Sequence, residues 1–273
     1  MLYLVSTPIG NLQDITLRAL SSLKSCDYIL CEDTRHSAKL LQAHGITTAL
    51  VSYHRFNERK RQDAIINDLL SGKHIALISD AGTPVIADPG FTLVQECHSA
   101  KIPVTVIPGP CALICALTLS GVSTTPFQFV GFLPKKESEL KKMLDAIVDY
   151  PGTTCAYESP HRVKETLTAL AKIAPQAKVT LCRELTKQYE TILSATAEDL
   201  LTSIQEIKGE IVLIIEAVKR TTSHTFSPKL VQALVADLVA QGSTTKEAIY
   251  TVSQTLRMAK NTVYEIVHLA LDD

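Results

Sequence analysis

Three turns of the chain combine glycine and proline with small polar side chains, and each follows an apolar run. They span residues 7–11, 79–84 and 108–112. Glycine has no Cβ and lets backbone N–H and C=O groups approach a ligand, and proline holds a loop in one conformation. Ligands of open parallel sheets bind beyond the carboxyl ends of the strands. Three such turns at one sheet edge predict a site for an adenosine-sized ligand that backbone groups recognise.

The alternative interpretation is that glycine and proline only mark ordinary turns here. It is the better interpretation of a single turn, whereas three turns at one edge favour a site. The sequence has no Gly-x-Gly-x-x-Gly, no Gly-x-x-x-x-Gly-Lys-Ser/Thr and no Gly-x-Ser-x-Gly motif. Hydride transfer, NTP hydrolysis and α/β-hydrolase chemistry are therefore disfavoured.

Polar runs after other expected strands supply a second set of chemical groups. Acids, bases and amides occur together in residues 32–35, 54–59, 157–162 and 183–187. Such side chains at strand ends can take a proton or contact phosphate groups. Solvated loop charge is the alternative, and for any one run the two interpretations have equal weight. His54 taken alone favours a surface histidine over a base.

Composition bounds the class of protein. The chain has 273 residues, 46% hydrophobic and 20% charged, which fits two domains with a buried core. It has no apolar run of roughly 18 residues, as a membrane span needs, and its N-terminus reaches Pro8 too early for a signal peptide. Seven cysteines without Cys-x-x-Cys spacing favour reduced thiols in the cytoplasm and no metal. A net charge of −1 means that any RNA would have to meet local basic patches.

A parallel sheet is expected to position the three turns, in a first domain over 1–122. Its expected strands are 2–6, 27–31, 49–53, 74–79 and 104–107. The first expected helix is 15–24 with Asp14 as its cap, and the second begins at about residue 34 and stops at Gly45. The other expected helices are 57–71, 90–100 and 112–119. Near-continuous apolar strands that alternate with helices predict a parallel sheet covered on both faces.

A second α/β domain is expected over 123–220, after a linker at 121–126. Its expected strands are 127–132, 153–157, 178–182, 189–195 and 211–216, and its helices are 137–149, 162–173 and 197–207. A polar linker at 219–226 leads to a small helix-turn-helix-like module over 225–273, with helices at 229–240, 245–256 and 261–271. A packed helical tail is favoured over a DNA-reading module.

The ordered motifs resemble the ribosomal RNA small-subunit methyltransferase I family of the tetrapyrrole-methylase superfamily. They are residues 4–11, 32–35, 79–84 with 88–90, 108–110, 131–134, 157–162 and 183–187. The family usually has Ala where Ser6 stands, Ser where Ala87 and Cys111 stand, and a more His-rich version of residues 54–57. Cys111 removes a hydroxyl that could contact a cofactor.

The resemblance implies a fold, a reaction and partners. The fold has two α/β domains of tetrapyrrole-methylase type with a cofactor cleft between them, plus a small helical tail. The cofactor is S-adenosyl-L-methionine, and the reaction is 2′-O-methylation of cytidine 1402 in bacterial 16S rRNA within the 30S subunit. A cytoplasmic homodimer without metal or membrane contact is expected.

The candidate site residues fall into three groups. Cofactor binding is expected at Pro8, Ile9, Gly10, Asp80, Gly82, Thr83, Pro108, Gly109, Cys111, Ala112 and Tyr157. RNA contact is expected at Arg35, His54, Asn57, Arg59, Lys135, Lys136, Arg183 and Lys187. A ribose hydroxyl is a poor nucleophile, so a general base should help. Asp33 is the first candidate because it follows a strand that ends at the cleft, and Glu158 and Glu184 are its rivals.

Two other functions compete with this interpretation. A tetrapyrrole-ring methyltransferase would need a deep apolar trough for a flat macrocycle, whereas the polar strand ends here suit a polyanion better. A non-catalytic RNA-binding protein would not need three rigid cofactor turns. Cofactor binding separates the enzyme from the module, and methyl transfer to 30S subunits or to a porphyrinoid separates the two enzymes.

Overall fold

The computed structural model describes residues 1–204, 207–217, 226–256, 258 and 260–268. The chain forms two compact units, Met1–Val218 and Lys219–Asp273. Within the described residues, the first unit contains two five-stranded sheets and the second contains three helices. No helix in these ranges is long and apolar enough to cross a membrane. The predicted linker at 219–226 lies, apart from Phe226, outside the described residues.

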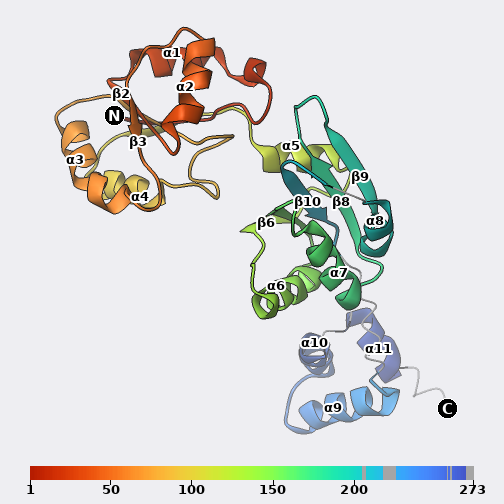
Figure 1. The fold of residues 1–273 in the computed structure, drawn as a ribbon. Coiled ribbons are helices and arrows are strands. Elements are labelled where there is room, and N and C mark those ends of the chain that lie inside the picture. Colours follow the sequence, from red (N-terminus) through yellow and green to blue (C-terminus); the bar gives the residue numbers. More distant parts are fainter. Residues whose placement is uncertain (205–206, 218–225, 257, 259, 269–273) are drawn as a thin grey trace. The chain divides into compact units, whose positions relative to one another are not determined.

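The first sheet is parallel throughout, as the apolar strands predicted, and has the strand order β3-β2-β4-β1-β5. Figure 1 labels its strands β2 and β3 and the helices α1 to α4 around it. Its strands are β1 (Leu2–Val5), β2 (Tyr28–Cys31), β3 (Leu50–Ser52), β4 (Ile75–Ile78) and β5 (Val104–Ile107). The helices that connect them are η1 (Leu12–Asp14), α1 (Leu17–Ser25), α2 (Thr34–Ala43), α3 (Glu58–Leu70) and α4 (Phe91–Ser99). One core packs Leu23 of α1 and Leu41 of α2 against one face, and another packs Leu69 of α3 and Leu93 of α4 against the other.

The first long helix begins later than its sequence predicts. Asp14 ends the short helix η1, and the cap of α1 is Thr16, whose Oγ1 accepts the backbone N–H of Ala19 at 3.1 Å. The predicted cap at Asp14 is therefore wrong. Leu17 then falls on the solvent side and is 86% exposed, while Leu23 lies in the core.

The strand order brings the three glycine- and proline-rich turns together. β1 pairs with β4 on one side and with β5 on the other, so the turns after these strands are neighbours. Thr7 and Gly82 exchange two backbone hydrogen bonds, at 2.9 and 3.0 Å. Thr83 Oγ1 donates to the carbonyl of Pro110 at 3.1 Å, so Ser6 Oγ is the donor in its 3.0 Å bond to Thr83. The prediction of three turns at one sheet edge is confirmed.

The second sheet is mixed and has the order β6-β7-β10-β8-β9. Only β6 and β7 are parallel, and the other neighbours in the sheet pair antiparallel. The strands are β6 (Phe127–Phe132), β7 (Thr153–Glu158), β8 (Lys178–Arg183), β9 (Thr191–Thr196) and β10 (Ile211–Ile215). The helices that pack on one face are α6 (Glu137–Asp149), α7 (Val163–Ile173) and α8 (Ala197–Ser203). The other face receives α5 (Ala112–Leu119), through Leu113, Ala116 and Leu117.

The helical unit contains α9 (Pro228–Ala240), α10 (Thr245–Thr255) and α11 (Lys260–His268). Val231, Val235, Ile249 and Val263 form its buried core with two further residues of α10. Thr244 begins α10 with a capping box, in which its Oγ1 accepts the Glu247 N–H and the Glu247 carboxylate accepts the Thr244 N–H. The predicted helical tail is confirmed for the described residues.

Candidate functional site

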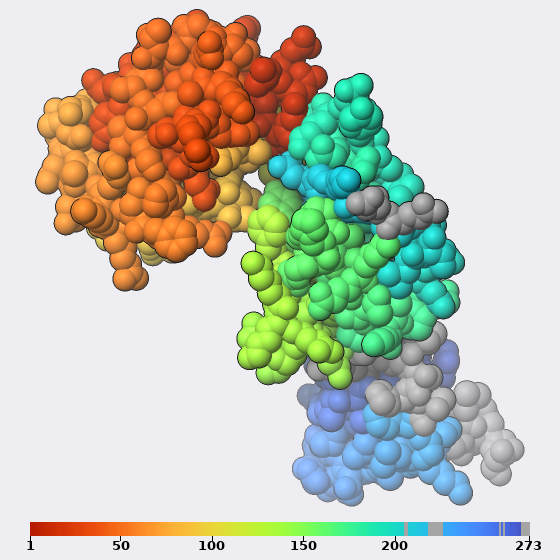
Figure 2. Space-filling model, in the orientation of Figure 1, coloured from red at the N-terminus to blue at the C-terminus, as the bar shows by residue number. Residues whose placement is uncertain are grey.

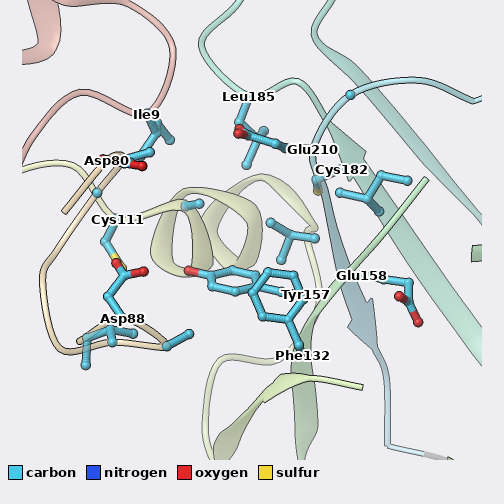
Figure 3. Close-up of a pocket in the computed structure, with 18 of the residues that line it drawn as sticks. Ile9, Asp80, Asp88, Cys111, Phe132, Tyr157, Glu158, Cys182, Leu185 and Glu210 are labelled. Carbon is cyan, nitrogen blue, oxygen red and sulfur yellow. The ribbon is translucent and has the colours of Figure 1, made fainter. Parts of the chain in front are cut away.

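A cavity of about 510 Å³ opens beside the three turns (Figure 3). Its walls come from the turns after β1 and β4, from the first residues of α5, and from strands and loops of the second sheet. Ligand sites of small molecules commonly measure roughly 300–1,000 Å³. The cavity therefore has the size of a site for a cofactor or a small substrate.

The charged side chains that line the cavity are acidic. The lining includes five acidic residues, Glu32, Asp80, Asp88, Glu158 and Glu210, and no described lysine, arginine or histidine lines it. Glu210 is paired with Lys187 at 3.0 Å, outside the lining. Several like charges around a partly dry space attract a cation and repel phosphate groups. The cavity is therefore suited to a positively charged ligand.

Asp88 has the most perturbed carboxyl group of the cavity. Burial raises its pKa to about 6, and the nearby carboxylates of Glu32 and Asp80 act in the same direction. A hydrogen bond from Ser79 and the charge of Arg55 oppose this rise. A carboxyl group with such a pKa accepts a proton more readily than an ordinary aspartate does.

The loop that carries Asp88 is strained. Val85 and Ala87 have φ values of 76° and 65°, in the left-handed region that side chains with a Cβ rarely adopt. Gly90 follows with φ of 122°, where an added Cβ would lie 2.6 Å from Leu77 Cδ2. Figure 3 shows the result, with Asp88 beside Cys111 and the Tyr157 hydroxyl pointing across the cavity towards both. Such strain is typical of residues held in a functional position.

The structure brings most of the predicted cofactor residues to the cavity. Those that line it are Ile9, Asp80, Gly82, Thr83, Cys111, Ala112 and Tyr157. Pro8 lines a smaller neighbouring cavity instead. Gly10, Pro108 and Gly109 line neither.

Gly10 and Gly109, the two predicted cofactor residues that are glycines outside the cavity lining, are needed for the packing of loops. A Cβ at Gly109 would lie 3.0 Å from Ser6 Cβ, and a Cβ at Gly10 would lie 2.4 Å from Lys187 Cγ. Gly10 thus lets the loop after β1 approach the loop after β8. Gly10 and Gly109 therefore allow the loops around the cavity to pack closely, without lining the cavity themselves.

Asp33, the first candidate for the base, does not line the cavity. Its Oδ1 accepts the backbone N–H of Arg35 at 2.8 Å and caps α2, and its Oδ2 lies 3.3 Å from Arg35 Nη2. The hydrogen bond from the Arg35 side chain lowers the pKa of Asp33. Its backbone N–H donates to Asp80 Oδ1 at 3.2 Å, so Asp33 holds a carboxylate that does line the cavity.

Glu158 reaches the cavity, but its carboxylate is held elsewhere. It accepts the Ser159 N–H and the Thr166 hydroxyl at 2.6 Å each, and it lies 3.5 Å from Arg162 Nη1. Its side chain is 1% exposed, and Figure 3 shows the carboxylate turned away from Tyr157. Arg162 also donates to the carbonyls of Leu133 and Pro134. This network ties β7 and α7 to the loop after β6.

Glu184 is also engaged. Lys187 Nζ lies 2.8 Å from Glu184 Oε1 and 3.0 Å from Glu210 Oε2, and Glu184 Oε1 accepts the Glu210 N–H at 2.9 Å. The hydrogen bond from Lys187 lowers the pKa of Glu184. A lowered pKa suits an ion pair that fastens a loop, and Glu184 itself does not line the cavity.

None of the residues predicted to contact RNA lines the cavity. Arg59, Lys135 and Lys136 are exposed, and Lys136 pairs with Glu139 at 3.4 Å. Arg35 forms an ion pair with Asp33, and Lys187 forms ion pairs with Glu184 and Glu210. Arg183 donates a hydrogen bond to the carbonyl of Tyr189.

His54 and Asn57 shape the loop after β3. Asn57 Oδ1 accepts the His54 N–H at 2.8 Å, and Asn57 Nδ2 donates to the Ser52 carbonyl at 3.2 Å. The neighbouring Arg55 donates to the carbonyl of Ala87, which lines the cavity.

Sequence reasoning missed fourteen of the lining residues, among them Glu32, Asp88, Phe132 and Glu210. Glu32 and Asp88 lie inside motifs that the sequence analysis had singled out. Both follow neighbouring parallel strands, β2 and β4, which is the signal that could have found them. In the part of the chain that the structure describes, no three His, Cys, Asp or Glu side chains are placed so that they could hold a metal ion together.

Comparison with known proteins gives the class to which this fold and cavity belong. Residues 1–201 match the family described as Tetrapyrrole (Corrin/Porphyrin) Methylases. Among solved structures, diphthine synthase has a TM-score of 0.63 at 14% identity, covering 79% of this chain and 89% of that one. Uroporphyrin-III-C-methyltransferase from Thermus thermophilus has a TM-score of 0.56 at 20% identity, covering 79% and 93%. The chain is thus a methyltransferase of the tetrapyrrole-methylase type, a class that uses S-adenosylmethionine in general.

Closer relatives identify the family within that class. The "Ribosomal RNA small subunit methyltransferase I" proteins of Halalkalibacterium halodurans and Haemophilus influenzae are each 42% identical to it. These alignments cover 98% of this chain and 94% and 97% of the relatives. The chain belongs to the ribosomal RNA small subunit methyltransferase I family.

Proposed function

We propose that the chain transfers a methyl group from S-adenosylmethionine to the 2′-oxygen of cytidine 1402 in bacterial 16S rRNA, acting on the 30S subunit. The observation that carries the proposal is the acidic cavity at the edge of the parallel sheet, in a chain of this family. As the resemblance implies, we further propose that the enzyme is a homodimer in the bacterial cytoplasm.

The cavity fits the cofactor in charge and in surface. S-Adenosylmethionine has a sulfonium and an ammonium cation and a single carboxylate, so its net charge is positive. Glu32, Asp80 and Asp88 offer the carboxylates that such a ligand needs, and Ile9 and Leu185 offer apolar surface for its adenine ring. The same carboxylates would repel the phosphates of a nucleotide cofactor. When bound, the cofactor supplies a methyl group that is already activated for transfer.

The chain's own part in the reaction is alignment and proton removal. The three turns are fastened to one another by the hydrogen bonds among Thr7, Gly82, Thr83 and Pro110, so they hold their ligand in one place. Alignment of reacting groups contributes roughly 7–11 kcal/mol in favourable cases. The remaining task is to accept the proton of the ribose hydroxyl.

Asp88 is better placed for that task than the three carboxylates predicted from sequence. Asp33 and Glu184 lie outside the cavity lining, and Glu158 is buried and hydrogen bonded on its far side. Asp88 lines the cavity and, with a pKa of about 6, is ionised near neutral pH. We therefore propose Asp88 as the proton acceptor, with Glu32 as its neighbour.

The test is transfer of a tritiated methyl group to three substrates by enzyme shown to bind S-adenosylmethionine. The substrates are 30S subunits, naked 16S rRNA and a porphyrinoid precursor. We expect 2′-O-methylcytidine at position 1402 of the 30S product, located by nuclease digestion and mass spectrometry. Transfer only to the porphyrinoid would establish the competing function, and no transfer to 30S subunits would refute the proposal.

A further inference from the structure

Residues 54–61, which link β3 to α3 and form the first turn of α3, carry an exposed basic cluster. This segment, called the basic segment below, contains Arg55, Arg59, Lys60 and Arg61 against one acid, Glu58. All four cations are exposed, and none forms an ion pair within the described ranges. The helix α3 that carries most of them lies at the left edge of Figure 2, in orange. Four exposed cations without an ion pair in eight residues suit a polyanionic ligand.

Phe56 follows Arg55 in this segment and is 97% exposed, more than any other large hydrophobic side chain that the structure describes. Its ring contributes almost nothing to the core, yet its backbone is held firmly. His54 Nδ1 accepts the Phe56 N–H at 3.2 Å, and the two rings lie edge to face with centroids 6.0 Å apart. Single exposed apolar residues are common on protein surfaces. An exposed ring in a segment rich in cations is a different case, because that combination binds nucleobases and phosphates.

The basic segment is joined to the wall of the cavity. Arg55 Nη2 donates to the carbonyl of Ala87 at 3.0 Å, and Ala87 and Asp88 both line the cavity. The Arg55 charge also acts on the Asp88 carboxyl group. A strand that contacted Phe56 would therefore lie next to the strained loop that presents Asp88.

We propose that the basic segment holds single-stranded RNA beside the reacting nucleotide. In this proposal, which rests on the proposed function, an unpaired base stacks on Phe56, and Arg59, Lys60 and Arg61 neutralise phosphates of the same strand. Stacking requires an unstacked base, which a loop or a single strand offers and a regular duplex does not. The segment gives a chain of net charge −1 a local surface for its polyanionic substrate. One ring among four cations suits RNA better than a protein partner, which would need a larger apolar area.

The first experiment measures binding directly. Fluorescence anisotropy gives the Kd of a labelled single-stranded RNA and of the matching duplex for the wild type, Phe56→Leu and Phe56→Trp. Leu17→Ala is the matched control, because Leu17 is also an exposed apolar residue and lies on α1. We expect Phe56→Leu to raise the Kd for the single strand by ~5- to 100-fold, as loss of one stacked base does, and Phe56→Trp to retain binding. Leu17→Ala should bind as the wild type does.

Methyl transfer separates this inference from the proposed function. Wild-type transfer to 30S subunits, with a raised KM for Phe56→Leu and an unchanged Kd for S-adenosylmethionine, supports both. Wild-type transfer with equal KM and equal RNA affinity in Phe56→Leu overturns the basic segment as a stacking site and leaves the proposed function intact. If the wild type methylates no RNA, the proposed function fails, and the anisotropy comparison still decides the binding site. Absence of single-strand binding, or tighter binding of the duplex, overturns the inference.

Discussion

The cavity and the basic segment carry opposite charge within the unit Met1–Val218. The cavity is lined by five acidic residues and by no described cation, while the basic segment carries four cations and one carboxylate. Arg55 joins the two regions, because it donates to the carbonyl of Ala87 and its charge acts on Asp88. The net charge of −1 is a sum over the whole chain, so it reveals neither the acidic cavity nor the basic segment. A near-neutral chain can thus offer one surface to a cationic cofactor and another to a polyanion.

The largest expected effect is on the rate of methyl transfer, and it distinguishes Asp88, which lines the cavity, from Asp33, which lies beside it. Asp88→Asn should lower the single-turnover rate of methyl transfer by ~10²–10⁴-fold, the usual contribution of a general base. Asp33→Asn is the matched variant, because asparagine also caps helices well and Asp33 does not line the cavity. It should react at nearly the wild-type rate. A normal rate for Asp88→Asn would remove Asp88 as the base, and a large loss for Asp33→Asn would return that role to Asp33.

The folding of Asp88→Asn is checked by its stability. Folding raises the pKa of Asp88, so the folded state disfavours the ionised form, and stability is lost as pH rises towards 6. Replacing the carboxylate with an amide removes this loss. Urea unfolding at pH 8 should therefore show that Asp88→Asn is at least as stable as the wild type. A slow variant with that stability has lost a function rather than its fold.

The second effect concerns Glu158, a carboxylate of the cavity wall that serves the fold. Glu158→Gln keeps the size of the side chain but disturbs the bonds to Thr166 and Arg162 in a site that is 1% exposed. We expect a loss of about 2 kcal/mol in the free energy of unfolding, because a buried charged partner is left poorly bonded. Glu165→Gln, on the exposed face of α7, the helix that carries Thr166, should change it by less than ~0.5 kcal/mol. Unchanged stability and a large rate loss in Glu158→Gln would instead place Glu158 in the chemistry.

These variants follow from what the sequence could and could not predict. The three turns were predictable because glycine and proline mark them and because parallel strands end at one edge. That Glu32 and Asp88 line the cavity while Asp33 does not was hard to predict. It depends on which side chain caps α2 and on φ values above 60° at Val85 and Ala87. Whether Glu158 points into the cavity likewise depends on the partners that a distant helix supplies.

The fold shows the same division. Apolar runs predicted the strands of both sheets, and the parallel order of the first followed from the alternation with helices. The position of β10 between β7 and β8 is a long-range pairing that no local pattern encodes. The start of α1 was missed because Asp14 and Thr16 are both good caps, and the choice between them depends on the turn of η1 before them.

A third effect tests the cavity as a cation site. Below pH 6 Asp88 becomes protonated and loses its attraction for a sulfonium cation. The affinity for S-adenosylmethionine, measured by calorimetry, should therefore rise by about 10-fold between pH 5 and pH 7.5, since one pKa unit corresponds to about 1.4 kcal/mol. S-Adenosylhomocysteine is the matched ligand, because its sulfur is uncharged, and its affinity should change less. Equal pH dependence for both ligands would show that the cavity does not recognise the sulfonium charge.

The smallest effect tests the basic segment by its charge alone. Each phosphate that a cation neutralises on a single strand contributes about −0.7 to the slope of log K against log salt concentration. Lys60→Gln should therefore flatten that slope by up to about 0.7 and weaken RNA binding a few-fold at low salt, with no change in the affinity for the cofactor. Lys101→Gln, an exposed cation outside the basic segment, is the control and should leave the slope unchanged. If both variants change the slope equally, RNA binding depends on the overall charge of the molecule and not on the basic segment. The contrast between an acidic cavity and a basic segment would then describe the surface without explaining how the substrate is held.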